Sequence, residues 1–183
     1  MKRLIVYILL VSAFVSCGKG YNESETDNIK PKQDNSKSKK EKNDKALLNI
    51  NKVLAEKEAT QIKGYIERRK WKMKVVEGVF IEKTRQGEGR AITDSSIVKL
   101  EYTLDLITGE KLYSSSKDGV KTIRFGVSGT EPVGLLHILC TMKMGDEANL
   151  IIPSYLGYGL YGDGKKVPAH ATLVYSIKIV DVK

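Results

Sequence analysis

The sequence has little cysteine, since its 183 residues include only Cys17 and Cys140. Cys17 ends an apolar run, whereas Cys140 lies in an apolar stretch with helical spacing. No base neighbours Cys140 in the sequence, so we expect a small, buried apolar side chain there rather than a reactive thiol. The hydrophobic share of 41% is enough for one core of ordinary domain size, about 100–150 residues.

The sequence also lacks a dominant run of like charge. The formal net charge is +9, yet lysines are mixed with aspartates and glutamates throughout residues 18–45. A surface that binds nucleic acid would cluster lysine and arginine on one face, often with stacking aromatic residues. We therefore expect no nucleic-acid partner and interpret the charge as a solvated basic surface. Weak attraction to an anionic membrane is the alternative.

Metal-ligating residues are equally sparse. The two histidines, His137 and His170, have no cysteine or carboxylate beside them at ligand spacing. Protein metal sites combine several such donors in a fixed geometry. We therefore expect no metal and no other cofactor.

No apolar run is long enough to span a bilayer, which takes about 20 residues. Residues 1–16 open with Lys2-Arg3 and continue with the apolar run Leu4–Val15, which is typical of a secretory signal peptide. Ser16 then precedes Cys17, and a small residue before a cysteine at this point resembles the bacterial lipobox. The pattern predicts a lipoprotein signal peptide and a lipid on Cys17, which leaves no disulfide for the mature domain. The chain would then be a membrane-anchored lipoprotein of the bacterial cell envelope; the alternative is an ordinary signal peptide with an incidental cysteine.

Two segments follow this anchor. Residues 17–45 have almost no apolar side chains, so beyond the cysteine they are predicted to be a disordered linker. Residues 46–71 are predicted to be an amphipathic helix, because apolar residues recur at roughly helical spacing. These residues are Leu47, Ile50, Val53, Leu54, Ile62, Tyr65 and Ile66. The apolar face could pack against the domain or pair two chains as a homodimer, and we favour packing because a sustained heptad seam is absent.

Downstream of Glu77 the hydrophobic pattern changes to the period of two that is typical of strands. Strands are predicted over residues 79–81, 97–106, 121–127, 148–153 and 171–182. One apolar stretch, Gly134–Met144, has helical spacing instead. Several strands with one internal helix and no βαβ alternation predict an α+β domain over residues 77–183. Its antiparallel sheet would carry the helix across one face.

Two motifs near the C-terminus resemble those of a known family. Residues 153–159 read PSYLGYG and residues 167–175 read VPAHATLVY. They resemble the FKBP-type peptidyl-prolyl isomerases, whose loop carries Tyr-Gly, then Ile-Pro, then Ala-Thr-Leu and an aromatic residue. The resemblance implies an FKBP-like antiparallel sheet curved around a short central helix, with the amphipathic helix before it.

Further segments extend the resemblance in the family's order over about residues 77–183. Residues 134–135 and 142–146 resemble the segment around the family's central helix, and residues 100–103 resemble its first pocket strand. The end of the preceding helix, residues 68–71, is similar to lipoprotein FKBPs of Bacteroidetes-type bacteria. Some of those proteins are associated with gliding motility.

The resemblance also implies a proline-binding pocket. Tyr102 and Tyr158 would be the catalytic residues, with the Tyr158 hydroxyl offered to a substrate carbonyl. The other residues placed at the pocket by the resemblance are Leu112, Tyr113, Ile123, Leu135, Val167 and Tyr175.

Two departures from the family pattern weaken this expectation of activity. The family usually has Phe-Asp where this chain has Leu112-Tyr113, so a pocket carboxylate is missing, and Tyr113→Asp is expected to raise activity. Near Glu131-Pro132 the family supplies a backbone N–H to the ligand, and proline has none. Val133 could replace that donor if the register differs by one residue.

Three functions stay open on this sequence. The first is a rotamase that isomerises X-Pro bonds during protein folding, with proline-containing polypeptides of the envelope as substrates. The second is a chaperone or assembly factor that holds proline segments without turnover. The third is a structural lipoprotein whose domain is only a scaffold, because a fold does not fix a function.

Overall fold

The computed structural model describes residues 35–127 and 129–183. The predicted signal peptide, Cys17 and the linker up to residue 34 lie outside the described residues. Helix α1, Asn35–Arg69, begins upstream of the predicted start at residue 46. The added residues include several lysines and no proline, and lysine favours helix. In the part of the chain that the structure describes, no helix is both long and apolar enough to cross a membrane.

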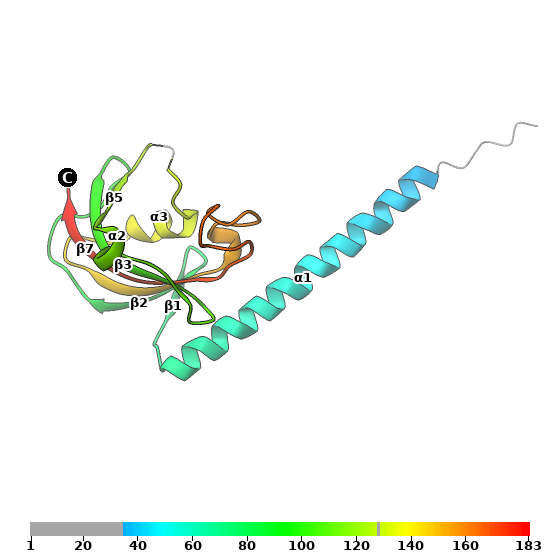
Figure 1. Cartoon of the computed structure of the whole chain (residues 1–183), viewed down its shortest axis with the longest axis horizontal. Helices are drawn as coiled ribbons and strands as arrows, with labels where there is room; N and C mark the ends of the chain where they lie inside the picture. The colour runs from blue at the N-terminus through cyan, green and yellow to red at the C-terminus, as the bar shows by residue number, and fades with distance from the viewer. Residues whose placement is uncertain (1–34, 128) are drawn as a thin grey trace, which may run out of the picture. The chain divides into compact units, whose positions relative to one another are not determined.

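Residues 41–183 form one compact unit. Within the described ranges, seven strands make one antiparallel sheet in the order β1-β2-β6-β7-β3-β4, and β5 pairs with β3 outside this path. The strands are β1 (Lys74–Val76), β2 (Val79–Arg85), β3 (Ile97–Leu106), β4 (Lys111–Ser114), β5 (Lys121–Arg124), β6 (Glu147–Ile152) and β7 (Leu173–Val182). Short helices join them: α2 (Ser115–Asp118), α3 (Val133–Leu139) and the 3-10 helix η1 (Ser154–Leu156). Figure 1 shows the sheet curving around α3, which confirms the predicted α+β fold.

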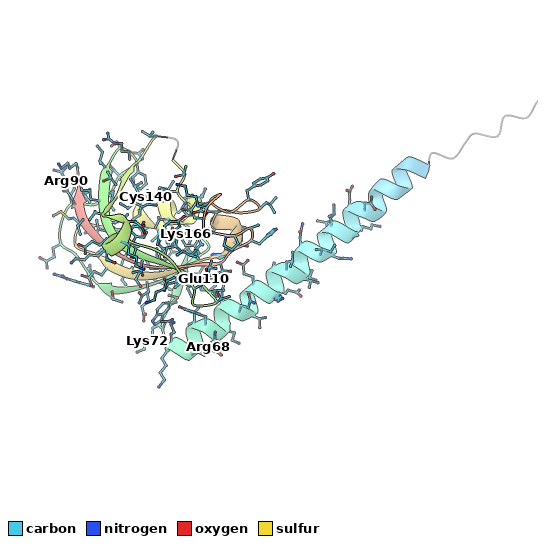
Figure 2. All side chains as sticks on the ribbon, viewed as in Figure 1. Arg68, Lys72, Arg90, Glu110, Cys140 and Lys166 are labelled. Atoms are coloured by element: carbon cyan, nitrogen blue, oxygen red, sulfur yellow. The ribbon has the colours of Figure 1, made fainter. Side chains whose placement is uncertain are left out.

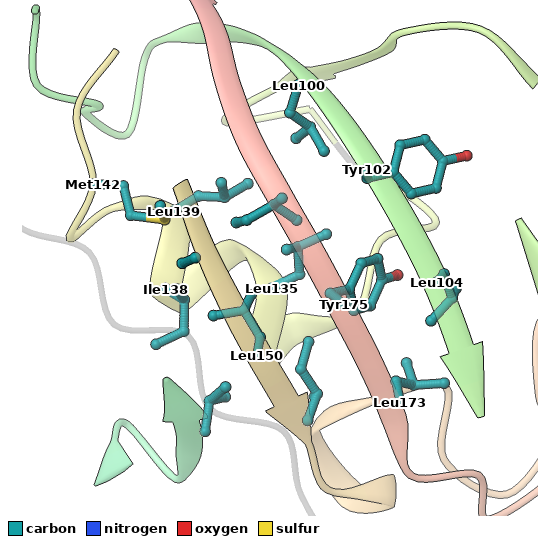
Figure 3. Close-up of a cluster of buried hydrophobic side chains, with 14 of the residues drawn as sticks. Leu100, Tyr102, Leu104, Leu135, Ile138, Leu139, Met142, Leu150, Leu173 and Tyr175 are labelled. Carbon is teal, nitrogen blue, oxygen red and sulfur yellow. The ribbon is translucent and has the colours of Figure 1, made fainter. Parts of the chain in front are cut away.

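The long central strands follow the period of two that the sequence predicts. In β3 the side chains of Val98, Leu100 and Tyr102 are buried, and those between them are less so. Its partner β7 places Ile177 opposite Tyr102, so each strand covers the inner face of its neighbour. The inner face is therefore continuous and apolar, and it carries Tyr102 and Tyr175 on neighbouring strands (Figure 3).

Helix α3 packs on this inner face. Leu135, Ile138 and Leu139 are fully buried against the sheet. Gly134 allows the close approach, because an added Cβ would lie 2.7 Å from Cγ2 of Ile152. The helix is shorter than predicted, since the chain turns after Leu139 and the Thr141 hydroxyl donates to the carbonyl of Ile138 at 2.7 Å.

The prediction that Cys140 is buried is wrong, because its side chain is exposed (Figure 2). Leu135, Ile138, Leu139 and Met142 define the buried side of this segment, and Cys140 falls outside that stripe.

The outer face of the sheet is covered by the C-terminal end of α1. Ile62 and Tyr65 are buried in a second cluster with Ile151 of β6 and Val174 of β7. This contact confirms that the helix packs against the domain through residues near its end. Its earlier apolar residues, such as Leu54, are exposed. Pairing of two chains through this helix stays a prediction.

Candidate functional site

A pocket of about 480 Å³ opens beside Tyr102 of β3. Its walls come from β3, β4 and β5 and from the loop between η1 and β7, residues 157–172. The lining residues are Tyr102, Leu104, Tyr113, Lys121, Thr130, Tyr158, Gly162, Asp163 and Lys165. Three of the predicted site residues, Tyr102, Tyr113 and Tyr158, therefore meet in one cavity.

The other predicted residues do not line this cavity. They belong to the buried core cluster against which Tyr113 and Tyr158 pack. The residues are Leu112, Ile123, Leu135, Val167 and Tyr175, all buried. They give the pocket an apolar, close-packed support.

Tyr102 forms one wall of the pocket. Its inward position follows from its place in the alternating pattern of β3. Its ring centroid lies 6.5 Å from that of Tyr175, and Nζ of Lys121 lies 5.4 Å from the Tyr102 centroid. Lys121 is also paired with Glu131, whose carboxylate lies 2.7 Å away. One side of the pocket is thus aromatic with a neutralised charge pair next to it.

Tyr158 stands at the start of the loop, and its side chain is half-buried. Burial raises the pKa of the Tyr158 hydroxyl to about 12, with a further contribution from the charge of Glu131. The hydroxyl therefore stays protonated at neutral pH and can donate a hydrogen bond. This is the chemical property that a group binding a substrate carbonyl requires.

The pocket contains a carboxylate from the loop, Asp163, although β4 carries Tyr113 where the family usually has an aspartate. Asp163 Oδ2 accepts a hydrogen bond from the Tyr113 hydroxyl at 2.5 Å. Asp163 Oδ1 accepts from the backbone N–H groups of Lys165 and Val167, both at 2.8 Å. Burial alone would raise the pKa of the Asp163 carboxyl, but these hydrogen bonds hold it below its usual value. A loop aspartate thus supplies the negative charge that β4 does not.

The aromatic ring of Tyr113 also contacts Lys166. Nζ of Lys166 lies 4.7 Å from the ring centroid and donates to the carbonyl of Leu112 at 3.1 Å. Burial and the bond to Asp163 raise the pKa of the Tyr113 hydroxyl to about 12. The hydroxyl is accordingly a fixed donor, and it ties the loop to β4.

Two further features bear on how a ligand would be held. Tyr175 is fully buried, and among the described residues its hydroxyl has no hydrogen-bond partner. Pro132 directly precedes α3 and has no N–H, so that position offers no backbone donor. Val133 is the first residue of α3 and is exposed.

Comparison with known proteins identifies this arrangement. Residues 88–180 match the family model of FKBP-type peptidyl-prolyl cis-trans isomerases, which spans half of the chain. The chain belongs to this family. It is 34% identical over 106 residues to the FK506-binding protein of Neisseria meningitidis serogroup B, a match that covers 57% of this chain and 96% of that protein.

Two longer FKBP-type relatives extend the comparison. A probable FKBP-type peptidyl-prolyl cis-trans isomerase FkpA of the same bacterium is 38% identical over 99 residues, covering 54% of this chain and 36% of that protein. The crystal structure of FkpA from Escherichia coli is 26% identical with a TM-score of 0.59, covering 88% of this chain and 75% of that chain. The chain therefore spans about a third of the first relative's length, and what the two share is the FKBP domain.

Proposed function

We propose that this FKBP-type protein is a peptidyl-prolyl cis-trans isomerase that acts on X-Pro bonds of exported proteins in the bacterial envelope. The observation that carries the proposal is the meeting of Tyr102, Tyr113 and Tyr158 around one cavity above a buried apolar layer. Such a cavity fits the ring of a proline and the flat amide before it. Family membership adds independent support.

Isomerisation of an X-Pro bond needs neither a nucleophile nor a metal. The barrier of about 18–20 kcal/mol arises from the double-bond character of the amide. A site lowers this barrier if it binds the twisted amide better than the planar one. The twisted amide is less polarised, so an aromatic pocket with little water favours it. In this pocket the protonated Tyr158 hydroxyl would orient the segment by donating to a substrate carbonyl.

A second candidate function is a chaperone or assembly factor that binds proline segments without turnover. The absence of a backbone donor at Pro132 favours it, because weaker orientation of the substrate lowers catalysis more than apolar binding. A refolding assay on a protein limited by proline isomerisation separates the two functions. A catalyst accelerates refolding at substoichiometric amounts, whereas a holding protein acts only at stoichiometric amounts and leaves the slow phase unchanged.

Tyr158→Phe is expected to lower kcat/KM on X-Pro peptides by about 3–10-fold, because it removes one hydrogen-bond donor and keeps the ring. Tyr161→Phe is the matched control. Tyr161 lies in the same loop and is 90% exposed, so removal of its hydroxyl should leave kcat/KM unchanged. Equal effects of the two substitutions would show that the Tyr158 hydroxyl does not contact the substrate.

The membrane anchor is also part of the proposal. A small residue, Ser16, stands before Cys17 where a short apolar run ends. Two or more acyl chains are enough to hold a protein on a membrane. We expect Cys17→Ser to release the protein into the soluble envelope fraction or leave its precursor unprocessed. Mass spectrometry of the wild type without any lipid mass would overturn the anchor and leave the isomerase proposal intact.

A further inference from the structure

Glu58 of α1 connects the N-terminal helix to both ends of the pocket loop. Its Oε1 accepts a hydrogen bond from the backbone N–H of Ser154 at 2.6 Å, and its Oε2 accepts from the Ser154 hydroxyl at 3.0 Å. Its Oε1 also accepts from the Thr172 hydroxyl at 2.5 Å. Ser154 begins η1 just before the loop, and Thr172 ends the loop just before β7.

The segment enclosed by these two contacts carries the pocket residues of the loop. Tyr158, Gly162 and Asp163 all lie between Ser154 and Thr172. One carboxylate thus fixes the two positions from which the loop leaves the sheet and returns to it. The pair Ile152–Leu173 of β6 and β7 already closes the loop, and the bonds to Glu58 extend this closure to Ser154 and Thr172, which shortens the segment that is free to move.

The carboxylate is itself held in place by the packing of α1. Glu58, Ile62 and Tyr65 recur at intervals of four and three, so they lie on one side of the helix. Ile62 and Tyr65 are buried against Ile151 and Val174 of the sheet. The helix therefore cannot turn Glu58 away from the loop without exposing these two side chains.

The environment of Glu58 makes its contacts strong ones. Thr172 is 5% exposed and Glu58 is half-buried, so water competes weakly for the hydrogen bonds. Bonds to an ionised acceptor are also stronger than those between neutral groups. At the far end the loop is tied to β4 through Asp163 and Tyr113. The loop is accordingly held at its base by α1 and near its tip by β4.

We propose that Glu58 is a positioning residue that couples α1 to the pocket by fixing the loop that presents Tyr158. It acts without touching the substrate. The inference rests on the proposed isomerase function for its kinetic consequence, but the effect on the loop is independent of that function. Helix α1 then contributes to the geometry of the pocket in addition to connecting the domain to the N-terminal segment.

The test uses the full chain with Glu58→Gln and Glu58→Ala, and Glu56→Gln as the matched control. Glu56 lies on the same helix, with a side chain that is 66% exposed. The measurements are kcat and KM on an X-Pro peptide, and hydrogen exchange of the backbone amides in the loop and in β3 and β7. We expect Glu58→Ala to lower kcat/KM about tenfold, mainly through KM, and to speed exchange in the loop only. Glu58→Gln, whose single oxygen can still accept the two bonds made to Oε1, should fall between Glu58→Ala and the wild type.

The outcomes separate this inference from the proposed function. Faster loop exchange in both Glu58 variants, with none in Glu56→Gln, supports the coupling even if the wild type isomerises nothing. Unchanged loop exchange and unchanged KM in Glu58→Gln and Glu58→Ala would overturn it even if the wild type is an active isomerase. If Glu58→Ala also speeds exchange in β3 and β7, that variant is destabilised as a whole. The test then depends on Glu58→Gln, which keeps the shape of the side chain. Faster exchange in its loop alone supports the coupling, and unchanged loop exchange contradicts it.

Discussion

Tyr113→Asp is expected to lower kcat/KM on X-Pro peptides by at least about tenfold, because it breaks a donor bond to a charged group. The substitution removes the hydroxyl that donates to Asp163, and the shorter aspartate side chain adds a second negative charge to the same side of the pocket without reaching Asp163. The two carboxylates repel each other, which disfavours the ionised form of both. The loop would then lose its tie to β4. Sequence comparison alone predicts the opposite, because Tyr113 stands where the family usually has an aspartate.

A double substitution tests this explanation. In Tyr113→Asp with Asp163→Asn, the repulsion between two carboxylates is removed, but the hydrogen bond that ties the loop to β4 is still missing, so only part of the lost kcat/KM should return. Tyr113→Phe serves as the control that removes the hydroxyl without adding charge, and its loss should be smaller than that of Tyr113→Asp. A Tyr113→Asp protein more active than the wild type would contradict the role assigned to Asp163.

Gly162→Ala is expected to abolish most peptide binding, by about a hundredfold, while leaving the sheet folded. Gly162 has a φ of 67°, and a Cβ added there would lie 2.0 Å from the backbone oxygen of Val167. That contact is far inside van der Waals distance, so the loop backbone must move. Loss of a precise position for catalytic groups has effects of this size. The pocket residues Tyr158 and Asp163 lie on the part of the loop that would shift.

Gly164→Ala is the matched control for this substitution. Gly164 lies in the same loop with a φ of 72°, but a Cβ added there would meet nothing within 4 Å. It therefore adds backbone strain of about 1–2 kcal/mol without a clash. Peptide affinity and hydrogen exchange of the β3 amides should be measured for both variants. Equal loss of affinity would show that strain alone, and not the clash with Val167, determines the effect.

The sequence predicts those parts of the fold that are long and regular. β3 and β7 are ten residues each, and their alternation is visible without knowledge of their partners. β4 was not predicted, because it has four residues and begins with an exposed lysine. It becomes a strand through pairing with β3, a tertiary effect that local propensity cannot show. The start of α1 was misplaced for a related reason, since a charged segment without proline can be either linker or helix.

The candidate site was predicted in part for the same reason. Tyr102 and Tyr158 lie in recognisable motifs, so the resemblance finds them. Asp163 lies 50 residues from Tyr113 in the sequence, and only folding brings them together. The sequence indicates a role for Glu58 only weakly, because it is a charged residue on the side of α1 that also carries Ile62 and Tyr65. A polar residue in an apolar stripe indicates a specific buried partner, since an unpaired charge there is unfavourable.

Exchange between the cis and trans forms of an X-Pro peptide, followed by NMR, tests the central claim most directly. Uncatalysed exchange takes tens to hundreds of seconds. We expect substoichiometric protein to raise the exchange rate of the peptide. In an isotope-labelled sample of the protein, we expect the peptide to shift the NMR signals of Tyr102, Tyr113 and Tyr158. Tyr158→Phe should reduce the rate. A folded wild-type protein that neither speeds exchange nor shifts at these residues with saturating peptide would contradict the account.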